Sequence, residues 1–222
     1  MLWIVITSPS FSDGEALFIS RMLAHGVDLV HLRKPGATEN DCAGLLDSLT
    51  GDERRRIVIH DFFGLAEPYG LRGIHLNSRH SEIPAGYTGH ISRSCHSLDE
   101  VRDCKDRYSY VFLSPIFDSV SKQGYNAAFT PEVLAGASAS GLIDNKVVAL
   151  GGVTPDRLGY LDSLGFGGAA MLGHVTGIAN LPVPEQISRL EDIRMQFSLT
   201  GRQPASDDNR HLTASASDSI RI

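Results

Sequence analysis

Eight short apolar runs recur along the chain, separated by longer segments of mixed character, and this alternation constrains the fold more than any other feature. Runs that are mostly apolar, without strict alternation, are typical of strands covered on both faces of a parallel sheet. The sequence therefore predicts an α/β protein built on parallel strands. The predicted strands are Trp3–Thr7, Leu29–Arg33, Ile57–His60, Gly73–Leu76, His90–Ser94, Tyr110–Ser114, Val147–Leu150 and Gly168–Leu172.

The segments between these runs carry helix signals. Thr130-Pro131-Glu132 and Thr154-Pro155-Asp156 each provide a capping residue, a proline at the first helical position and an acidic first turn. Ser97 and Glu100 fit a capping box. Further helices are predicted over Glu15–Ala24, Glu39–Leu49, Arg157–Leu164 and Pro184–Met195, while Phe63–Leu71 and Asn77–Gly89 are weakly helical at best.

Eight strands that alternate with helices fit either a closed (β/α)8 TIM barrel or a doubly wound open sheet. The strand count and the nearly regular spacing favour a single barrel. The first strand is also not followed by the G-x-G-x-x-G turn that a dinucleotide-binding sheet would place there. We expect the barrel to span residues 1–197. Residues 198–222 are rich in Ser, Thr, Asp and Ala, and we expect a disordered tail there.

Composition restricts the partners and the compartment. The 222 residues carry 26 acidic and 20 basic side chains, a net charge of −6, which argues against nucleic-acid binding as the main function. The three cysteines are too few for a disulfide framework and form no C-x-x-C pair. No apolar stretch has the length of a membrane span, and the N-terminus lacks the features of a signal peptide. We expect a cytoplasmic protein without membrane partners; the oligomeric state stays open, a homo-oligomer included.

In a barrel, function lies where strands end and the following loops begin. His31, Arg33 and Lys34 lie at the end of the second strand before Pro-Gly, and two cations there suit a phosphate or diphosphate, although a solvated strand end would look similar. Asp61 follows the third strand and is either a magnesium ligand or a helix cap. His75, in an apolar strand, is better explained as a core residue.

The later loops suit phosphorylated ligands. The loop after the sixth strand is rich in hydroxyl groups and contains Lys122, as expected of a mobile loop over a phosphorylated substrate. Gly152 follows the seventh strand and Gly173 the eighth, which is the usual phosphate site of this fold. Backbone N–H groups of such loops can approach an anion closely. The sequence thus predicts small phosphorylated substrates.

The order of these segments resembles thiamine phosphate synthase and its relative, the thiazole tautomerase. The resemblance covers roughly residues 1–196 and implies a barrel that joins hydroxymethylpyrimidine diphosphate to thiazole phosphate, releasing diphosphate with the help of Mg²⁺. The segments that carry it are H-L-R-K after strand two, V-I-H-D at strand three, G-I-H-L at strand four, S-x-H-S at strand five, S-P-I-F-D-S-V-S-K at strand six and A-L-G-G-V-T at strand seven.

The resemblance also implies roles for individual residues. Asp61 would bind Mg²⁺, and Arg33, Lys122 and His60, which stands where the family usually has Asn, would form the catalytic set. The diphosphate would also contact Ser94, and the pyrimidine segment would include His31 and Lys34. The thiazole phosphate would lie against Ser119, Ser121, Gly152, Leu172 and Gly173.

Three positions depart from the family pattern. Pro35 replaces a lysine, and His80 stands where a second magnesium carboxylate is expected. Pro115 stands where the tautomerase has a histidine that transfers protons. The synthase is the preferred hypothesis. The alternatives are a thiazole phosphate tautomerase that uses His60, His75 or His31 as its base, and a low-activity relative that only binds phosphate.

Overall fold

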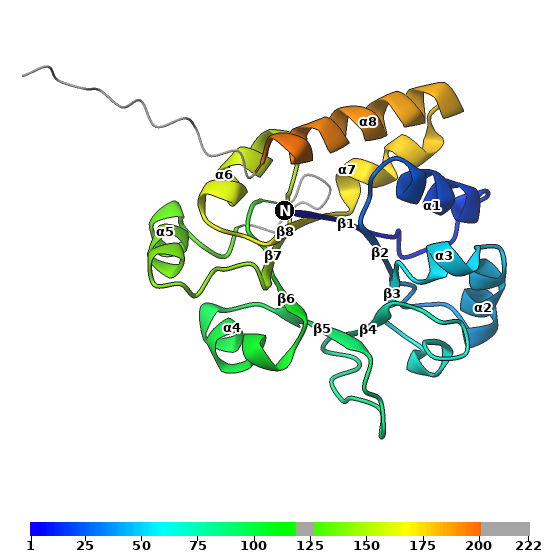
Figure 1. Ribbon diagram of the computed structural model, residues 1–222, viewed down its shortest axis with the longest axis horizontal. Coiled ribbons are helices and arrows are strands. Elements are labelled where there is room, and N and C mark those ends of the chain that lie inside the picture. Colours follow the sequence, from blue (N-terminus) through cyan, green and yellow to red (C-terminus); the bar gives the residue numbers. More distant parts are fainter. Residues whose placement is uncertain (119–126, 201–222) are drawn as a thin grey trace, which may run out of the picture.

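The computed structural model describes residues 1–118 and 127–200, and within them eight parallel strands close into a barrel. Neighbours in sequence pair in order around the ring, and β8 pairs with β1 to close it. Figure 1 shows the ring with the helices outside it. This confirms the predicted TIM barrel. The strands are β1 (Leu2–Ile6), β2 (Leu29–Leu32), β3 (Ile57–Ile59), β4 (Gly73–Leu76), β5 (His90–Cys95), β6 (Tyr110–Leu113), β7 (Val147–Leu150) and β8 (Gly168–Met171).

The helices cover most of the outer face of the ring. The connections on either side of β4 contain only the 3-10 turn η1 (Phe63–Leu65) and irregular loops, as their weak periodicity predicts. The longer elements are α1 (Glu15–Ala24), α2 (Glu39–Asp47), α4 (Leu98–Cys104), α5 (Pro131–Ala139), α6 (Leu158–Ser163) and α8 (Val183–Leu199), and the short ones are α3 (Gly51–Arg54), α7 (Gly173–Thr176), η2 (Lys105–Arg107), η3 (Pro155–Arg157) and η4 (Ile178–Asn180).

Several helix ends differ from the sequence prediction. The Ser97 side chain accepts the Glu100 N–H as expected, but the Glu100 carboxylate accepts from the His96 N–H, so the capping box is incomplete. Thr154 makes no capping bond, and the segment after it begins as η3 before α6 forms. The final helix runs past its predicted end, because Phe197 is buried and stacks on Trp3 at 5.4 Å between ring centroids.

The end of α8 also shifts the expected boundary of the domain. Ser198 and Leu199 belong to the helix rather than to a tail. The rest of the predicted tail, residues 201–222, lies outside the described residues, so the expected disorder there stays a prediction. No helix in the described ranges is long and apolar enough to cross a membrane.

The interior of the barrel has an apolar half and a polar half. The apolar half lies on β1, β6, β7 and β8, which supply Ile4, Ile6, Phe112, Val148 and Ala170. The polar half lies along β2 to β5. His31, His75 and Ser92 are buried on β2, β4 and β5, and His60 is buried directly after β3. Barrel interiors are usually filled by branched apolar residues, so this polar half needs internal partners.

Hydrogen bonds within the interior satisfy these polar groups. His31 Nδ1 lies 2.8 Å from His60 Nε2, and His31 Nε2 lies 2.5 Å from the Tyr110 hydroxyl. His75 bonds Ser92 and Ser94 through its two ring nitrogens, at 2.8 Å each. His75 is fully buried, which confirms that it is a satisfied core residue.

Burial keeps these imidazoles neutral. It lowers the pKa of His75 to about 3, with a smaller contribution from His90. Burial also lowers the pKa of His31 well below its usual value, and nearby His75 and His90 act in the same direction. Removing a charge from water without a counter-charge is unfavourable, so the folded barrel resists protonation at both sites.

We therefore expect stability to fall in mild acid. Below about pH 6.5 the unfolded chain takes up protons at His31 and His75 while the folded chain does not, so the free energy of unfolding drops as the pH falls. The expected loss between about pH 6.5 and pH 5 is about 2 kcal/mol for each residue. Urea unfolding at the two pH values measures it.

The matched variant His75→Gln should lose the contribution of that one imidazole, about 2 kcal/mol, while those of the other buried imidazoles remain. The control His25→Gln, at the end of α1, should keep the contributions of the buried imidazoles. Equal stability of the unchanged protein at both pH values would show that the buried imidazoles accept protons in the folded state.

Candidate active site

The carboxyl ends of the strands gather most of the predicted site residues at one end of the barrel. Arg33 follows β2, Asp61 lies just beyond β3, Ser94 lies near the end of β5 and Gly152 follows β7. Gly173 begins α7 directly after β8. Because all strands are parallel in a closed ring, these positions share one rim, which we call the mouth.

Asp61 is the most constrained charged group at the mouth. Its side chain is buried, and its Oδ1 lies 3.1 Å from Arg79 Nη2 and 3.2 Å from His80 Nε2. Its Oδ2 is buried and has no hydrogen-bond partner within the described ranges. The next residue, Phe62, has a φ of 54°, a left-handed conformation that is costly for a bulky side chain. The predicted alternative, a helix cap by Asp61, is wrong, because η1 has no side-chain cap.

Arg79 and His80 were not among the residues predicted to bind ligands. Asn77, after β4, holds them in place: its Oδ1 accepts the backbone N–H groups of Arg79 and His80, and its Nδ2 donates to the His60 carbonyl. Asn in this role forms a tight turn through its own side chain. The N-S-R-H segment after a barrel strand was the signal that could have identified Arg79.

Arg33 adds a second guanidinium to the mouth. Burial lowers the pKa of Arg33, the positive charge of Arg79 lowers it further, and the carboxylate of Asp61 opposes both. The two arginines are thus close enough to repel each other around a single buried carboxylate. An excess of positive charge that is partly removed from water attracts a multiply charged anion.

Of the buried histidines inside the barrel, His60 is the one that lies at the mouth. His60 follows β3 and is almost fully buried, with its Nε2 bonded to His31. Burial lowers the pKa of His60 well below its usual value, with His75 and His31 as the next contributors. His31 has no exposed surface, so a contact between His31 and substrate would have to pass through His60. The predicted role of His31 in binding stays a prediction.

Lys34 is held by the protein itself. Its ammonium group is buried, ion-pairs with Glu15 at 2.6 Å, and donates to the carbonyls of Ser8 and Ser10 at 2.9 Å. An ammonium group has three donors, and these partners use all of them. The geometry therefore gives Lys34 a structural role, tying the loop after β1 to the end of β2, and leaves no donor for a substrate.

The remaining predicted contacts lie around the same rim. Ser94 is engaged with His75, and Leu172 connects β8 to α7 beside the apolar half of the interior. Gly152 has a φ of 62°, and a Cβ there would lie 2.2 Å from the Asp118 carbonyl oxygen. Close packing of the loops after β6 and β7 therefore already requires this glycine. Ser119, Ser121 and Lys122 lie outside the described residues.

The described residues at the mouth offer one carboxylate, Asp61, as a ligand for a magnesium ion. Asp61 Oδ2 is an oxygen of the kind that Mg²⁺ prefers, and it is buried without another partner in the described part of the chain. The expected second carboxylate is absent at His80, whose imidazole instead lies against Asp61 Oδ1. Substrate phosphates and water would have to complete the coordination, as they commonly do for Mg²⁺.

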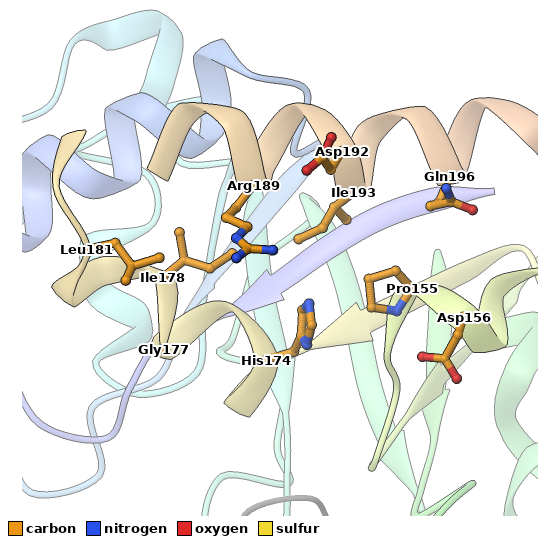
Figure 2. A pocket seen from close by; sticks show the side chains of 10 residues that line it. All are labelled: Pro155, Asp156, His174, Gly177, Ile178, Leu181, Arg189, Asp192, Ile193 and Gln196. Atoms are coloured by element: carbon orange, nitrogen blue, oxygen red, sulfur yellow. The ribbon is translucent and has the colours of Figure 1, made fainter. Parts of the chain in front are cut away.

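A cavity of about 580 Å³ lies between α8 and the segments that follow β7 and β8. Figure 2 shows its lining from α8, η3, α7 and η4, with Arg189 and His174 on opposite sides of it. Asp156 and Asp192 bring negative charge to the same lining, so it does not select for an anion. We therefore place the candidate active site around Arg33, Arg79 and Asp61 at the mouth rather than in this cavity.

Comparison with known proteins agrees with the geometry. Residues 3–175 match the family described as thiamine monophosphate synthase. The crystal structure of thiamine phosphate pyrophosphorylase from Bacteroides thetaiotaomicron is 37% identical and has a TM-score of 0.81, covering 90% of this chain and 98% of that one. The thiamine-phosphate synthase of Yersinia pestis is 29% identical over 174 residues, 72% of this chain and 78% of that protein.

A more distant structure shares the fold. Thiamine phosphate pyrophosphorylase from Pyrococcus furiosus is 19% identical, with a TM-score of 0.70 over 89% of this chain and 95% of that one. The family match covers most of the barrel, including the strand ends that bear Arg33, Asp61 and Gly152. The chain therefore belongs to the thiamine monophosphate synthase family.

Proposed function

We propose that this protein joins hydroxymethylpyrimidine diphosphate to thiazole phosphate and releases diphosphate. The observation that carries the proposal is the group of Arg33, Arg79 and Asp61 at the mouth, in a chain whose relatives are thiamine-phosphate synthases. The same rim bears the loops after β7 and β8, where barrels of this kind bind phosphate. One end of the barrel could thus hold a diphosphate and a monophosphate together.

The reaction requires stabilisation of charge more than proton transfer. The bond between the pyrimidine methylene carbon and the diphosphate oxygen breaks, and its electron pair leaves with the diphosphate. The thiazole nitrogen then supplies its lone pair to form the new carbon–nitrogen bond. No electron or proton is gained or lost in sum. The pyrimidine ring carries positive charge in transit, so the protein must stabilise the anion and align the two rings.

The residues expected from the sequence would divide this work. Arg33 and Lys122 would neutralise the charge that develops on the leaving diphosphate, and Ser94 would lie against it. The thiazole phosphate would lie against the backbone at Gly152 and Gly173, with Ser119, Ser121 and Leu172 lining its site. Neutral His60 would contact the pyrimidine through the small part of its side chain, 4% of the residue surface, that stays exposed.

Magnesium is part of the proposal. Asp61 Oδ2 would hold the ion, which when bound would offset negative charge on the diphosphate. Asp61 also positions Arg79 by accepting its guanidinium, so the carboxylate links the ion site to a fixed cation. We propose a single protein carboxylate at this ion, because His80 occupies the other expected position.

The isomerase alternative has less support. The relatives described above are a thiamine-phosphate synthase and thiamine phosphate pyrophosphorylases, and Pro115 stands where the tautomerase has its histidine. His31 and His75 are bonded inside the barrel and have no surface at the mouth with which to act as a base. A cytoplasmic location and soluble phosphorylated substrates complete the proposal.

Asp61→Asn is expected to reduce turnover by about 100-fold or more while the barrel stays folded. The amide has nearly the same volume but lacks the anionic oxygen that a hard cation and Arg79 require. Steady-state formation of thiamine phosphate measures the effect, and circular dichroism checks the fold. Asp103→Asn on the exposed face of α4 is the matched control and should retain full turnover. Full activity of Asp61→Asn at limiting magnesium would contradict the metal role.

His80→Asp is expected to lower the magnesium concentration needed for half-maximal activity. A second carboxylate beside Asp61 adds an anionic ligand and removes an imidazole from Asp61 Oδ1. Magnesium titrations of the synthase reaction measure the shift, which we expect to be about tenfold. Ser78→Asp adds the same charge to the same loop and should shift the titration much less. A titration curve unchanged by His80→Asp would show that position 80 does not face the ion.

Lys122→Ala is expected to slow turnover by about tenfold or more, because it removes a cation from the developing diphosphate charge. Lys146→Ala is the control, since Lys146 pairs with Asp106 outside the mouth. Measurement of kcat and KM for both variants separates the chemical step from substrate capture. If Lys122→Ala raised only the KM for thiazole phosphate, Lys122 would belong to the other substrate.

A further inference from the structure

A second polar cavity lies at the opposite end of the barrel. It measures about 440 Å³ and is lined by residues at the starts of the strands. Arg56 immediately precedes β3, Arg72 precedes β4, His90 begins β5 and Tyr110 begins β6. These amino ends form the rim opposite the mouth, which we call the base. No predicted site residue lies there.

Positive charge dominates the lining of this cavity. Arg55, Arg56 and Arg72 contribute three guanidinium groups, against a single lining carboxylate, Asp28. Asp28 is already engaged, because its Oδ2 accepts the Trp3 N–H at 2.8 Å and lies 3.5 Å from Arg194. The cavity therefore keeps an excess of positive charge.

The three arginines differ in what they can offer a ligand. Arg55 is paired with Asp52 on the protein surface. Arg56 is fixed by donating to the main-chain carbonyls of Leu23, Val27 and Asp28, none of which neutralises its charge. Arg72 is exposed and has no ion pair or side-chain hydrogen bond within the described ranges. Arg72 thus presents a free guanidinium beside a fixed one.

An unpartnered polar atom at the same place supports a ligand. His90 Nε2 is buried and has no hydrogen-bond partner in the described part of the chain. Burial, and then the charge of Arg72, lower the pKa of His90 to about 4, which places the Arg72 guanidinium near the imidazole. A buried group without a partner is costly, and a ligand oxygen would satisfy it.

We propose that the base cavity binds a phosphorylated small anion through Arg72, Arg56 and His90. The planar guanidinium fork matches phosphate oxygens in pairs, and a volume of this size accommodates a small phosphorylated molecule. Arg56 needs no reorganisation to act as a cation, because its carbonyl partners already fix it. The neutral His90 imidazole can donate a hydrogen bond to the anion. A third positively charged side chain at the same place would first have to lose its hydration, which is costly.

The base is also connected to the mouth. The ring of His90 packs against Tyr110 at 5.1 Å, the Tyr110 hydroxyl bonds His31, and His31 bonds His60 at the mouth. An anion at His90 therefore lies one ring contact away from the hydrogen bonds that join Tyr110, His31 and His60. The binding proposal does not depend on the activity proposed for the mouth, and its test follows His90, which lies at the base.

The test is titration of the full chain with inorganic diphosphate, followed by NMR of its histidine side chains. His90→Gln assigns the His90 signal. We expect this signal to shift and to reach saturation. Arg72→Gln should raise the dissociation constant obtained from the shift by tenfold or more. Arg102→Gln, which alters an exposed ion pair on α4, should leave the constant unchanged. Arg72→Lys keeps the charge but loses the fork, and should give an intermediate constant.

Two further arms identify the ligand class. Inorganic phosphate should bind more weakly than diphosphate if two phosphoryl groups contact the arginines, and ATP should bind at least as tightly as diphosphate if the cavity admits a nucleotide. Arg33→Gln separates the two ends of the barrel, because it weakens diphosphate binding at the mouth and should leave the His90 titration intact. Loss of the His90 shift in Arg33→Gln would trace the signal to the mouth and overturn the proposal. A His90 signal that does not move at millimolar diphosphate, or that moves equally in Arg72→Gln, would overturn the proposal.

Discussion

Pairing between β1 and β8 closes the sheet, and the positions of the functional groups at both ends of the barrel depend on that closure. Leu2 pairs with Gly168 and Val5 with Met171, so the first and last strands are neighbours. Tight contacts between strands rely on glycine: a Cβ at Gly73 would lie 2.1 Å from the His90 carbonyl oxygen. Once the ring is closed, every strand presents its carboxyl end to the mouth and its amino end to the base.

Closure of the ring also restricts which side chains can point inward. The narrow interior has no room for bulk water, so a polar residue must find a partner among the other strands. The apolar half satisfies this requirement with branched and aromatic side chains. The polar half does so with neutral imidazoles bonded to one another and to hydroxyl groups, and His60 carries this network to the mouth. Neutrality is the condition for this arrangement, because a protonated imidazole there would lack a counter-charge.

The strands and the closed barrel could be predicted from the sequence. Each strand is encoded locally by its own apolar run, and eight such runs that alternate with helices favour a closed barrel. Helix α1 begins and ends at its predicted residues for the same reason: an apolar face and a terminal glycine are local signals. The end of α8 was missed because it depends on a distant contact, the stacking of Phe197 on Trp3. No pattern around Phe197 encodes that partner.

The site shows the same division. Positions at strand ends were predictable, so Arg33, Asp61 and Gly152 lie at the mouth as expected. What each side chain does there depends on partners far along the chain. Lys34 looked free in sequence, but Glu15 neutralises it from a different element. Arg79 was not predicted because its role depends on its ion pair with Asp61, which lies 18 residues earlier in the chain. Ion pairs between loops are set by the closed ring and leave no periodic signal.

The most direct test of the account is incubation of the purified protein with hydroxymethylpyrimidine diphosphate, thiazole phosphate and magnesium. We expect thiamine phosphate and diphosphate to form in equal amounts, and neither to form when one substrate is omitted. If the protein made no thiamine phosphate from the two substrates but converted thiazole phosphate alone, the mouth would be the site of an isomerase, and the assignment of a leaving diphosphate to Arg33 and Asp61 would be wrong.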